Sequence, residues 1–549
     1  MSEQDGRGGN GGGEGGGDGE KGGRKGGGDR RPGGPRGGQG GGPRGKGGPR
    51  GKGGPRGKGG PRGQGGPRRG PQRGPRRDDR PKRDDRPRPE RPAEPPKTER
   101  PPRKPPGPPI GARLADVEEV ELTIDKLVAG GDGLGRWNEV PIFVPRSAPG
   151  DRLRVRVVQW RADYGRGEIV EVLEAGEGRR EPPCPHFERC GGCDLQHLDY
   201  AAQVRHKAAA VLETMQRLGR LEPPTPKIVV GAEWGYRLRT QLHVEMEGGE
   251  ETEEGRLPAV GYFTRGTNEL VPVRVCPILV PELETMVPLL PDRIAEAGRP
   301  LARLDLAAGD GSGEAGIAAA PVVEGLPHGE LSLEVDGVAG FDRGFTYAYD
   351  ARCFFQAHRG LIASLIELAL GDAEWTGETA YDLYAGVGLF TLPLARRYGR
   401  VVAVEGDQGA ARYARMNARR DKATGVEVEH RALESWIDAL PAGADRVIVD
   451  PPRGGLGKKV RRALEENPAK RLTYVSCHPA TLARDLRQMV VHGPYELESL
   501  ALIDLFPQSG HMEAVGYDMY VDMLREAIAD LRGEEPGLVT APHPAGGRL

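Results

Sequence analysis

The sequence predicts an α/β protein in which a doubly wound, Rossmann-like domain follows a small β-barrel and a β-rich central segment. From about residue 360, apolar helical stretches alternate with short β-branched runs, which is the order of a parallel sheet with crossover helices. Residues 117–174 instead alternate apolar and polar positions in short runs separated by turn residues, a pattern typical of a small barrel. The N-terminal stretch contains too few apolar side chains to build a core.

Residues 1–112 form a Gly/Arg/Pro-rich tail that we expect to be disordered. Prolines at 43, 49, 55, 61 and 67 are each preceded by Gly-Gly and followed by Arg, which gives a six-residue repeat. The first 110 residues hold 29 Lys and Arg against 13 Asp and Glu, whereas the remainder holds 50 against 67. Such a basic tail either attracts RNA phosphates through charge or acts as a solubilising segment.

Neither membrane insertion nor secretion is indicated. The chain has no apolar run of the length of about 18 residues that a membrane span needs, and its N-terminus has no apolar signal core. We therefore expect a cytoplasmic protein, and a monomer.

The predicted barrel covers residues 113–176. Its "GGDGLGR" and "VPRSAPGDRLRVRV" stretches resemble the first turn and middle strands of a TRAM domain, an OB-like module that binds RNA. An unrelated five-stranded barrel is the alternative. In either case, OB-like barrels commonly bind single-stranded or looped nucleic acid.

Four cysteines suggest a metal site in the central segment, residues 177–350. Cys184, Cys190 and Cys193 have C-x5-C-x2-C spacing, and Cys276 follows downstream. Clustered cysteines in a cytoplasmic chain favour a metal over disulfides. Zinc and an iron–sulfur cluster both accept four thiolates, and the spacing does not separate them; reduced, unliganded thiols are the third reading.

The rest of the central segment alternates like strands, and we expect it to join the cysteine segment. Arg237 and Arg239 lie in one of these stretches, "WGYRLRTQ". They are predicted either to line one wall of an RNA cleft or to form the solvated face of a strand.

The C-terminal domain, predicted over residues 351–535 and followed by a flexible end at 536–549, has the features of an adenosine-binding site. Gly386 and Gly388 follow its first strand, and Glu405 ends its second strand, where a carboxylate can bind both ribose hydroxyls. A dinucleotide site would need a third glycine at Thr391. S-adenosylmethionine (SAM) is therefore favoured over NAD.

Two further strand ends should face the same crevice. "ADRVIVDPPRGG" delivers Asp450, and "RLTYVSC" delivers Cys477. A capping aspartate and an inert, buried cysteine are the alternatives, and the latter is our interpretation of Cys353.

These motifs occur in the order found in a known family. "FFQ", "DLYAGVGLF", "DPPRGG", "YVSCHPATLARDL" and "DLFPQSGHMEAV" make residues 115 to 530 resemble the bacterial RNA 5-methyluridine methyltransferases, most closely those that act on 23S rRNA and carry a TRAM domain and a [4Fe-4S] cluster. The resemblance implies SAM contacts at Gln356, Tyr384, Glu405 and Asp450, a nucleophile at Cys477, a base at Glu513, and cluster ligands at Cys184, Cys190, Cys193 and Cys276.

The implied reaction is SAM-dependent methylation of uracil C5 in RNA. The Cys477 thiolate would add to C6, and Glu513 would later remove the C5 proton. We expect rRNA as the substrate, with tRNA as the alternative. An RNA-binding protein with a degenerate catalytic domain is a second alternative; methylation of adenine or cytosine N4 is disfavoured because Arg453 replaces the aromatic residue typical of those enzymes.

The chain departs from the family pattern at several positions. His358, His478 and Leu389 stand where relatives often have asparagine, and Ala432 stands where some have a cofactor-contacting asparagine. None of these changes removes a reacting group.

Overall fold

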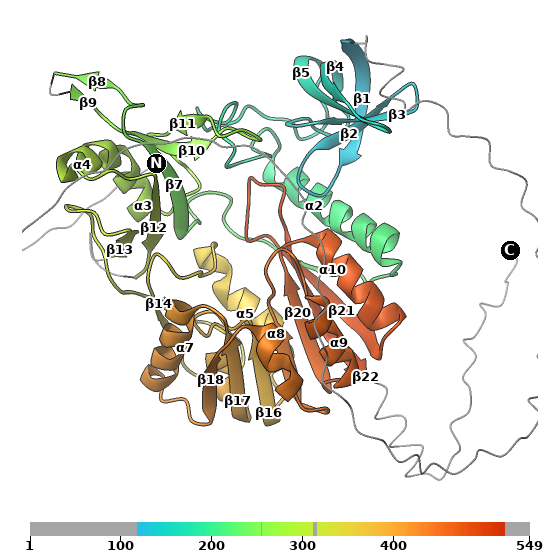
Figure 1. Ribbon diagram of the computed structural model, residues 1–549. Coiled ribbons are helices and arrows are strands. Elements are labelled where there is room, and N and C mark those ends of the chain that lie inside the picture. Colours follow the sequence, from blue (N-terminus) through green and yellow to red (C-terminus); the bar gives the residue numbers. More distant parts are fainter. Residues whose placement is uncertain (1–117, 254, 311–315, 522–549) are drawn as a thin grey trace, which may run out of the picture. The chain divides into compact units, whose positions relative to one another are not determined.

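The structure, a computed structural model, describes residues 118–253, 255–310 and 316–521 (Figure 1). The chain divides into two units, Met1–Glu99 and Arg100–Leu549, and every described residue belongs to the second. The predicted tail and the predicted flexible end at 536–549 lie outside the described residues. Within those residues, no helix has both the length and the apolar character needed to cross a membrane.

Five strands close into a barrel in the order β1-β2-β3-β5-β4. They are β1 (Glu119–Leu127), β2 (Gly133–Trp137), β3 (Val140–Val144), β4 (Arg152–Trp160) and β5 (Gly165–Glu174). Alternate residues of β1, among them Val120, Leu122 and Ile124, are buried inside the barrel. Gly135 has no room for a side chain, because an added Cβ would lie 2.5 Å from the backbone oxygen of Thr123. The predicted barrel is confirmed.

The cysteine segment, residues 177–198, follows the barrel and leads into α2 (Tyr200–Thr214), which continues as the π-helix η1 (Met215–Gly219). Asp199 caps α2, since its side chain accepts a hydrogen bond from the Ala202 amide at 2.7 Å. The buried side of α2 packs into the core of the C-terminal domain.

The central segment contains a five-stranded antiparallel sheet in the order β11-β10-β7-β12-β13. Its strands are β7 (Arg239–Glu245), β10 (Ala259–Phe263), β11 (Leu270–Pro272), β12 (Arg303–Ala308) and β13 (Ile317–Ala320). The remaining elements are the hairpins β8 (Glu251–Thr252) with β9 (Gly255–Arg256) and β14 (Leu331–Val335) with β15 (Phe345–Tyr349), and the helices α3 (Pro281–Met286), η2 (Val287–Leu289) and α4 (Leu290–Ala297). The segment is β-rich, as predicted.

The C-terminal domain contains an eight-stranded sheet in the order β18-β17-β16-β19-β20-β22-β21-β6. The first five strands run parallel, and β22 runs antiparallel between β20 and β21. The strands are β16 (Gly377–Leu383), β17 (Tyr398–Glu405), β18 (Val426–His430), β19 (Arg446–Val449), β20 (Arg471–Ser476), β21 (Tyr495–Ile503) and β22 (Glu513–Val521).

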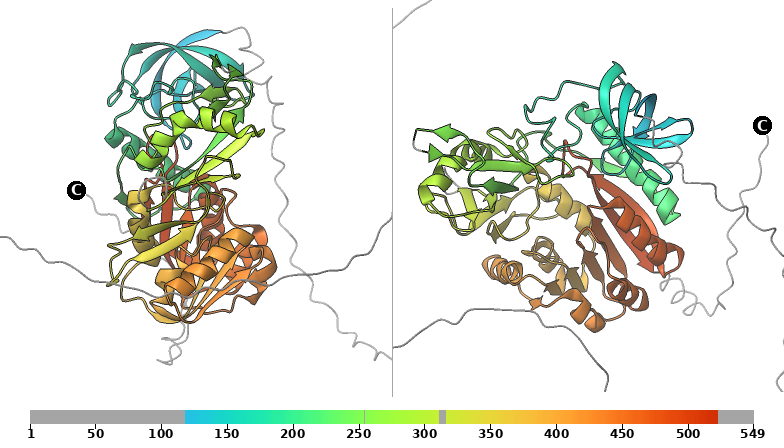
Figure 2. Two further views of the ribbon diagram at one scale, coloured as in Figure 1. Left: turned by 90° about the vertical axis from the view of Figure 1, so that its left-hand side faces the viewer. Right: turned by 45° about the horizontal axis from the view of Figure 1, so that its top comes forward.

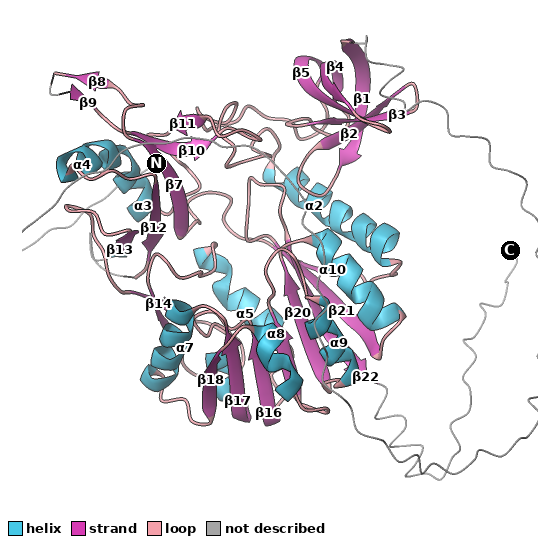
Figure 3. Ribbon diagram, in the orientation of Figure 1, coloured by secondary structure: helices cyan, strands magenta, loops and turns pink. Residues whose placement is uncertain are grey.

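Helices cover both faces of this sheet (Figures 2 and 3). One face packs with η4 (Arg359–Leu361), α5 (Ile362–Leu370), α6 (Thr391–Ala395) and α7 (Gln408–Arg420). The other packs with α8 (Leu433–Trp436), η5 (Ile437–Ala439), α9 (Lys458–Glu466), α10 (Pro479–Leu486), η6 (Arg487–Val491) and α2. Neighbouring residues of β16 alternate between these cores, Ala380 on one side and Tyr381 on the other. The doubly wound prediction is confirmed.

The edge strand β6 (Lys227–Val229) comes from the part of the chain predicted as the central domain. It pairs in parallel with β21, where Lys227 lies opposite Ala501. Three residues are too short for a periodic signal, so the sequence pattern gave no reason to expect this strand. The eight-stranded sheet therefore includes residues from before position 351.

Candidate functional site

The predicted site residues gather where the parallel strands end. Leu383 of β16 is in register with Val404 of β17 and Val449 of β19, and Val449 with Tyr474 of β20. The strands therefore end at one edge of the sheet, where ligands bind in doubly wound folds. This edge carries Tyr384, Glu405, Asp450 and Cys477.

The glycine turn after β16 is joined to the end of β17 by hydrogen bonds. The Gly386 amide donates to Glu405 Oε2 at 2.8 Å, and the Asp407 amide donates to Glu405 Oε1 at 2.7 Å. Gly386 has φ 56°, and a Cβ added there would meet no atom within 4 Å. The backbone thus faces open space beside a carboxylate that keeps free lone pairs for ligand hydroxyls.

Gln356, Tyr384 and Asp450 line one pocket beside this turn. Gln356 is buried, and its Nε2 lies 3.5 Å from Asp450 Oδ2. Phe354 lines the same pocket with 59% of its surface exposed, and the Arg239 guanidinium lies 5.4 Å from its ring centroid. An aromatic face beside an adenosine-type site can stack on a base. Phe354 is part of the "FFQ" motif, but the sequence does not show which residues surround its ring.

Asp382 lies fully buried beneath the glycine turn. The Thr391 hydroxyl donates a hydrogen bond to its Oδ2 at 2.5 Å. Burial raises the pKa of Asp382 to about 7, although the bond from Thr391 opposes this rise. Thr391, where a dinucleotide motif would have glycine, thus holds the turn against β16 in this chain.

Cys477 and Glu513 meet at the ends of two antiparallel strands. Ser476 of β20 pairs with Ala514 of β22, so the next residues, Cys477 and Glu513, are opposite each other. Glu513 also pairs with Ile503 of β21. It is 4% exposed, which rules out an ordinary surface carboxylate. Cys477 is half-buried beyond the strand end.

The two groups affect each other's protonation. Burial raises the pKa of the Cys477 thiol to about 11, and the charge of Glu513 adds to this rise. Burial, followed by the charge of Asp450, holds the pKa of Glu513 well above its usual range. Arg453 lowers both pKa values. Strongly shifted thiols and carboxylates in a crevice are typical of catalytic sites.

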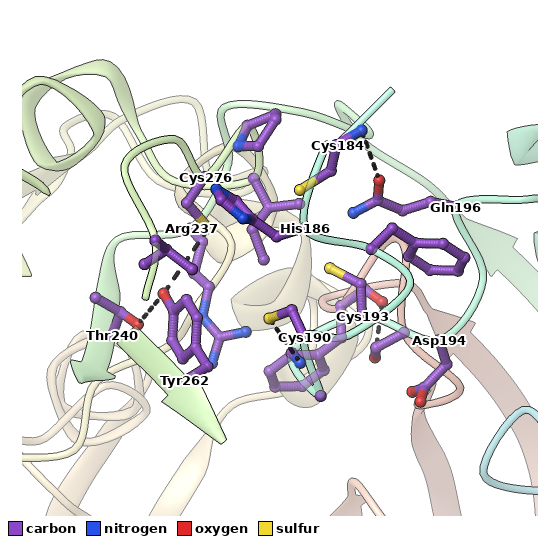
Figure 4. Close-up of a pocket in the computed structure, with 18 of the residues that line it drawn as sticks. Cys184, His186, Cys190, Cys193, Asp194, Gln196, Arg237, Thr240, Tyr262 and Cys276 are labelled. Atoms are coloured by element: carbon purple, nitrogen blue, oxygen red, sulfur yellow. Dashed lines mark hydrogen bonds between the residues drawn. The ribbon is translucent and has the colours of Figure 1, made fainter. Parts of the chain in front are cut away.

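A second cavity, of about 350 Å³, is lined by all four predicted ligand cysteines (Figure 4). Cys184, Cys190 and Cys193 come from the cysteine segment, and Cys276 from the loop after β11. Arg237 lines the same cavity, so the structure puts this arginine beside the thiols. In the described part of the chain, no group of His, Cys, Asp or Glu side chains is arranged to hold a single metal ion.

Burial in the cavity disfavours negative charge on these thiols. Burial raises the pKa of Cys193 to about 12 and that of Cys276 to about 11, and it also raises the pKa of Cys190. Each of these cysteines is further affected by the negative charge of another. Four thiolates would therefore need a bound cation for compensation.

Two family profiles match the chain. The tRNA (uracil-5-)-methyltransferase family matches residues 333–517, and the TRAM domain matches residues 114–170. A 23S rRNA (uracil(1939)-C(5))-methyltransferase of Pectobacterium atrosepticum is 30% identical over 444 residues, 75% of this chain and 96% of that protein. The Salmonella typhi enzyme of the same name is 31% identical over 73% of this chain and 96% of its own length.

The chain belongs to the RNA uracil-5 methyltransferase family. This confirms the predicted enzyme class, a SAM-dependent RNA (uracil-5-)-methyltransferase. A solved Pyrococcus abyssi tRNA (uracil-54, C5)-methyltransferase in complex with S-adenosyl-L-homocysteine has a TM-score of 0.53 and 22% identity; the match covers 73% of this chain and all of that one. This likeness supports the fold.

In this family member, residues 504–512 connect β21 to Glu513 and are held from several sides. The backbone oxygen of Gln508 accepts hydrogen bonds from the amides of Asp194 and Leu195 at 2.8 and 2.9 Å. Asp194 Oδ2 accepts one from the Gly510 amide at 3.0 Å. The cysteine segment therefore directly supports the loop that carries the candidate base.

Arg453 and His511 are further site residues that the sequence reasoning did not assign. Arg453 Nη2 lies 3.4 Å from His511 Nε2, and both residues line the wall of the cysteine cavity. Arg453 directly follows "DPP", and His511 lies in "SGHME". Their positions within the quoted motifs could have marked them as candidates. Their contact with each other depends on the fold and could not be read from the sequence.

Proposed function

We propose that this protein forms 5-methyluridine in 23S rRNA through a covalent bond between Cys477 and uracil C6. The observation that carries the proposal is the place of Cys477 next to the paired residues Ser476 and Ala514, opposite the buried Glu513 and near Asp450. The names of the relatives at 30–31% identity support 23S rRNA as the substrate.

In the proposed cycle, Cys477 acts at the first step and Glu513 at the last. Cys477 gives up its thiol proton to solvent, and the thiolate adds to C6, which makes C5 nucleophilic. The positive charge of Arg453 favours the thiolate that this step requires. Ionised Glu513 then accepts the C5 proton, after which the S–C6 bond breaks and the thiolate leaves.

SAM supplies the methyl group that C5 takes up. We propose that it binds at the pocket lined by Gln356, Tyr384 and Asp450, beside Gly386 and Gly388. Glu405 would accept hydrogen bonds from its ribose hydroxyls. Phe354 offers an exposed ring for stacking.

The four cysteines fit a [4Fe-4S] cluster, which we propose as a structural group. All four thiols line one cavity. An antiparallel bridge between Cys190 and Thr264 joins the cysteine segment to the turn before β11, the strand that Cys276 follows. A cluster spreads its negative thiolates over four irons and needs more room than one tetrahedral ion. The cluster would cross-link the cysteine segment to the loop after β11.

The test is nucleoside mapping after incubation with SAM. Purified protein is given, separately, 23S rRNA and a tRNA pool from a strain that lacks this gene. New 5-methyluridine in 23S rRNA alone supports the proposal. Methylation of tRNA alone would mean that tRNA is the substrate in place of 23S rRNA. Binding of both RNAs without methylation would favour an RNA-binding protein with an inactive methyltransferase domain.

A further inference from the structure

A groove of about 990 Å³ lies between the barrel and the cysteine segment. Its walls come from the turn after β3, from β5, from the cysteine segment and from the turn between β10 and β11. The residues that matter here are Arg146, Phe187, His197, Thr264 and Arg265, which we call the groove set. None of them belongs to the cysteine cavity except Phe187, which lines both.

Hydrogen-bonding atoms of the groove set are left without partners. Arg146 Nε, Arg265 Nη1 and Thr264 Oγ1 are buried and have no hydrogen-bond partner among the described residues. His197 is also buried, with 1% of its surface exposed, and its ring contacts the backbone of Ser147. Buried polar groups in folded proteins nearly always have a hydrogen-bond partner. Several groups without a partner in one groove therefore indicate a missing acceptor.

Arg146 also forms no ion pair with any residue that the structure describes. Its neighbours Arg179 and Arg265 form ion pairs, with Asp151 at 2.8 Å and with Asp132 at 2.8 Å, respectively. Arg146 instead donates to the backbone oxygens of Glu188 and Cys190, and no ion pair to it occurs within the described residues.

The side chain of Arg146 packs against an aromatic ring of the same groove. Its guanidinium lies 5.2 Å from the ring centroid of Phe187, and Phe187 in turn lies 5.9 Å from His197. An anion entering between Arg146 and Arg265 would accept hydrogen bonds from their free N–H groups.

We propose that the groove set binds a backbone phosphate of the RNA substrate. This inference rests on the proposed function for its ligand class. Phosphate oxygens accept several hydrogen bonds at once, and phosphate contacts fix the position of a nucleic acid without reading its sequence. Glu168, Glu181 and Glu188 also line the groove, so it favours one localised phosphate over a long basic track.

The experiment measures RNA affinity of the full chain as a function of salt concentration. Arg146→Ala removes one cation, so the slope of log affinity against log salt should fall by about one. Arg161→Ala is the matched control, because Arg161 is exposed on the same barrel and does not line the groove. Thr264→Val keeps the side-chain shape and removes one hydroxyl, so it should weaken binding severalfold with an unchanged salt slope.

Two further measurements identify the ligand. Inorganic phosphate should compete weakly with RNA for the unaltered protein and not for Arg146→Ala, and Arg146→Lys should recover part of the slope. Equal slopes for Arg146→Ala and Arg161→Ala, together with unaltered binding by Thr264→Val, would overturn the inference. Ordered water would then be the partner of the unpaired groups in the groove.

The outcome separates this inference from the proposed function. If the groove set binds phosphate but the wild-type protein makes no 5-methyluridine, only the proposed reaction fails. If the wild-type protein methylates RNA and neither groove variant differs from the control, only the phosphate site fails. Unfolding curves of each variant exclude a general loss of structure as the reason for weaker binding.

Discussion

Gln203 of α2 and Gln508 of the loop before Glu513 exchange two hydrogen bonds. Gln203 Nε2 donates to Gln508 Oε1 at 2.9 Å, and the Gln508 amide donates to Gln203 Oε1 at 3.0 Å. Both residues are fully buried, and Gln508 has a left-handed backbone with φ 67°. Because the loop ends at Glu513, this pair holds the backbone before the candidate base from outside the sheet.

Replacing Gln203 should therefore destabilise the protein. Gln203→Leu leaves the buried amide of Gln508 without its partner and removes one donor to Gln508 Oε1, which should lower the free energy of unfolding by ~1–3 kcal/mol. Denaturant unfolding measures this loss, and hydrogen exchange at Gln508 should accelerate. Gln159→Leu, an exposed position on the barrel, is the control. Equal stabilities of the two variants would contradict the role of the pair.

Cys477 and Glu513 substitutions should fail at different steps. Cys477→Ala should form no adduct with RNA and still bind SAM, because the residues of the cofactor pocket do not depend on the thiol. Glu513→Gln should form the adduct and then stall, leaving RNA bound covalently to Cys477. Denaturing gels distinguish the two. Turnover by Cys477→Ala, or normal turnover by Glu513→Gln without a trapped adduct, would refute these roles.

The buried carboxylate of Glu513 should cost stability as pH rises. Its pKa in the unfolded chain is near 4.5, and the folded value lies well above that. Above pH 4.5 the unfolded state then binds fewer protons than the folded state, so stability falls with rising pH until the folded pKa is passed. Glu513→Gln removes this penalty. Its advantage in unfolding free energy over the wild type should grow between pH 5 and pH 8.

The control for this titration is Glu177→Gln, since the Glu177 side chain is 94% exposed. Its difference from the wild type should stay nearly constant over the same range. A constant difference for Glu513→Gln as well would mean that Glu513 ionises normally in the fold.

Lys207 and Asp504 form a buried ion pair beneath the same loop. Lys207 Nζ lies 2.7 Å from Asp504 Oδ1, and the two side chains are 2% and 0% exposed. Lys207→Met leaves the carboxylate buried without compensation and should cost ~3–5 kcal/mol of stability. The double variant Lys207→Met/Asp504→Leu should recover most of this loss in thermal unfolding. If the double variant is less stable than the single one, the pair contributes more than charge compensation.

Removal of one cavity cysteine should abolish the cluster. Protein purified without oxygen should be brown and carry about four irons per chain, with absorbance near 400 nm. Cys276→Ala should lose the iron and the absorbance. Cys353→Ala should keep both, because Cys353 is buried outside the cavity. Stoichiometric zinc in the wild type, or full iron in Cys276→Ala, would contradict the cluster.

The residues at the strand ends of the candidate site could be predicted from two things: the short apolar runs that mark the strands, and the rule that parallel strands end at one edge of a sheet. Glu405, Asp450 and Cys477 follow short β-branched runs, and the ends of parallel strands meet at one edge. The pairing of Gln203 with Gln508 could not be predicted, because the two residues are 305 positions apart and neither has a periodic signal. Long-range side-chain contacts are set by the packed fold.

His478 shows why a departure from a family pattern can be silent. It is the N-cap of α10, and its Nδ1 accepts a hydrogen bond from the Thr481 amide at 3.3 Å. A ring nitrogen thus performs the capping that an asparagine side chain performs in other helices. The sequence showed the substitution, and only the helix geometry explains it.

The edge strand β6 changes how the chain can be divided. Since Lys227–Val229 pairs with β21, the polypeptide between β6 and β16 is an insertion within the catalytic unit, and a fragment starting at residue 351 would leave the outer rim of β21 unprotected. Such a fragment invites edge-to-edge association with other copies. A soluble minimal enzyme should therefore be cut upstream of β6, or have the insertion shortened by a linker, and not be trimmed at the start of the methyltransferase motifs.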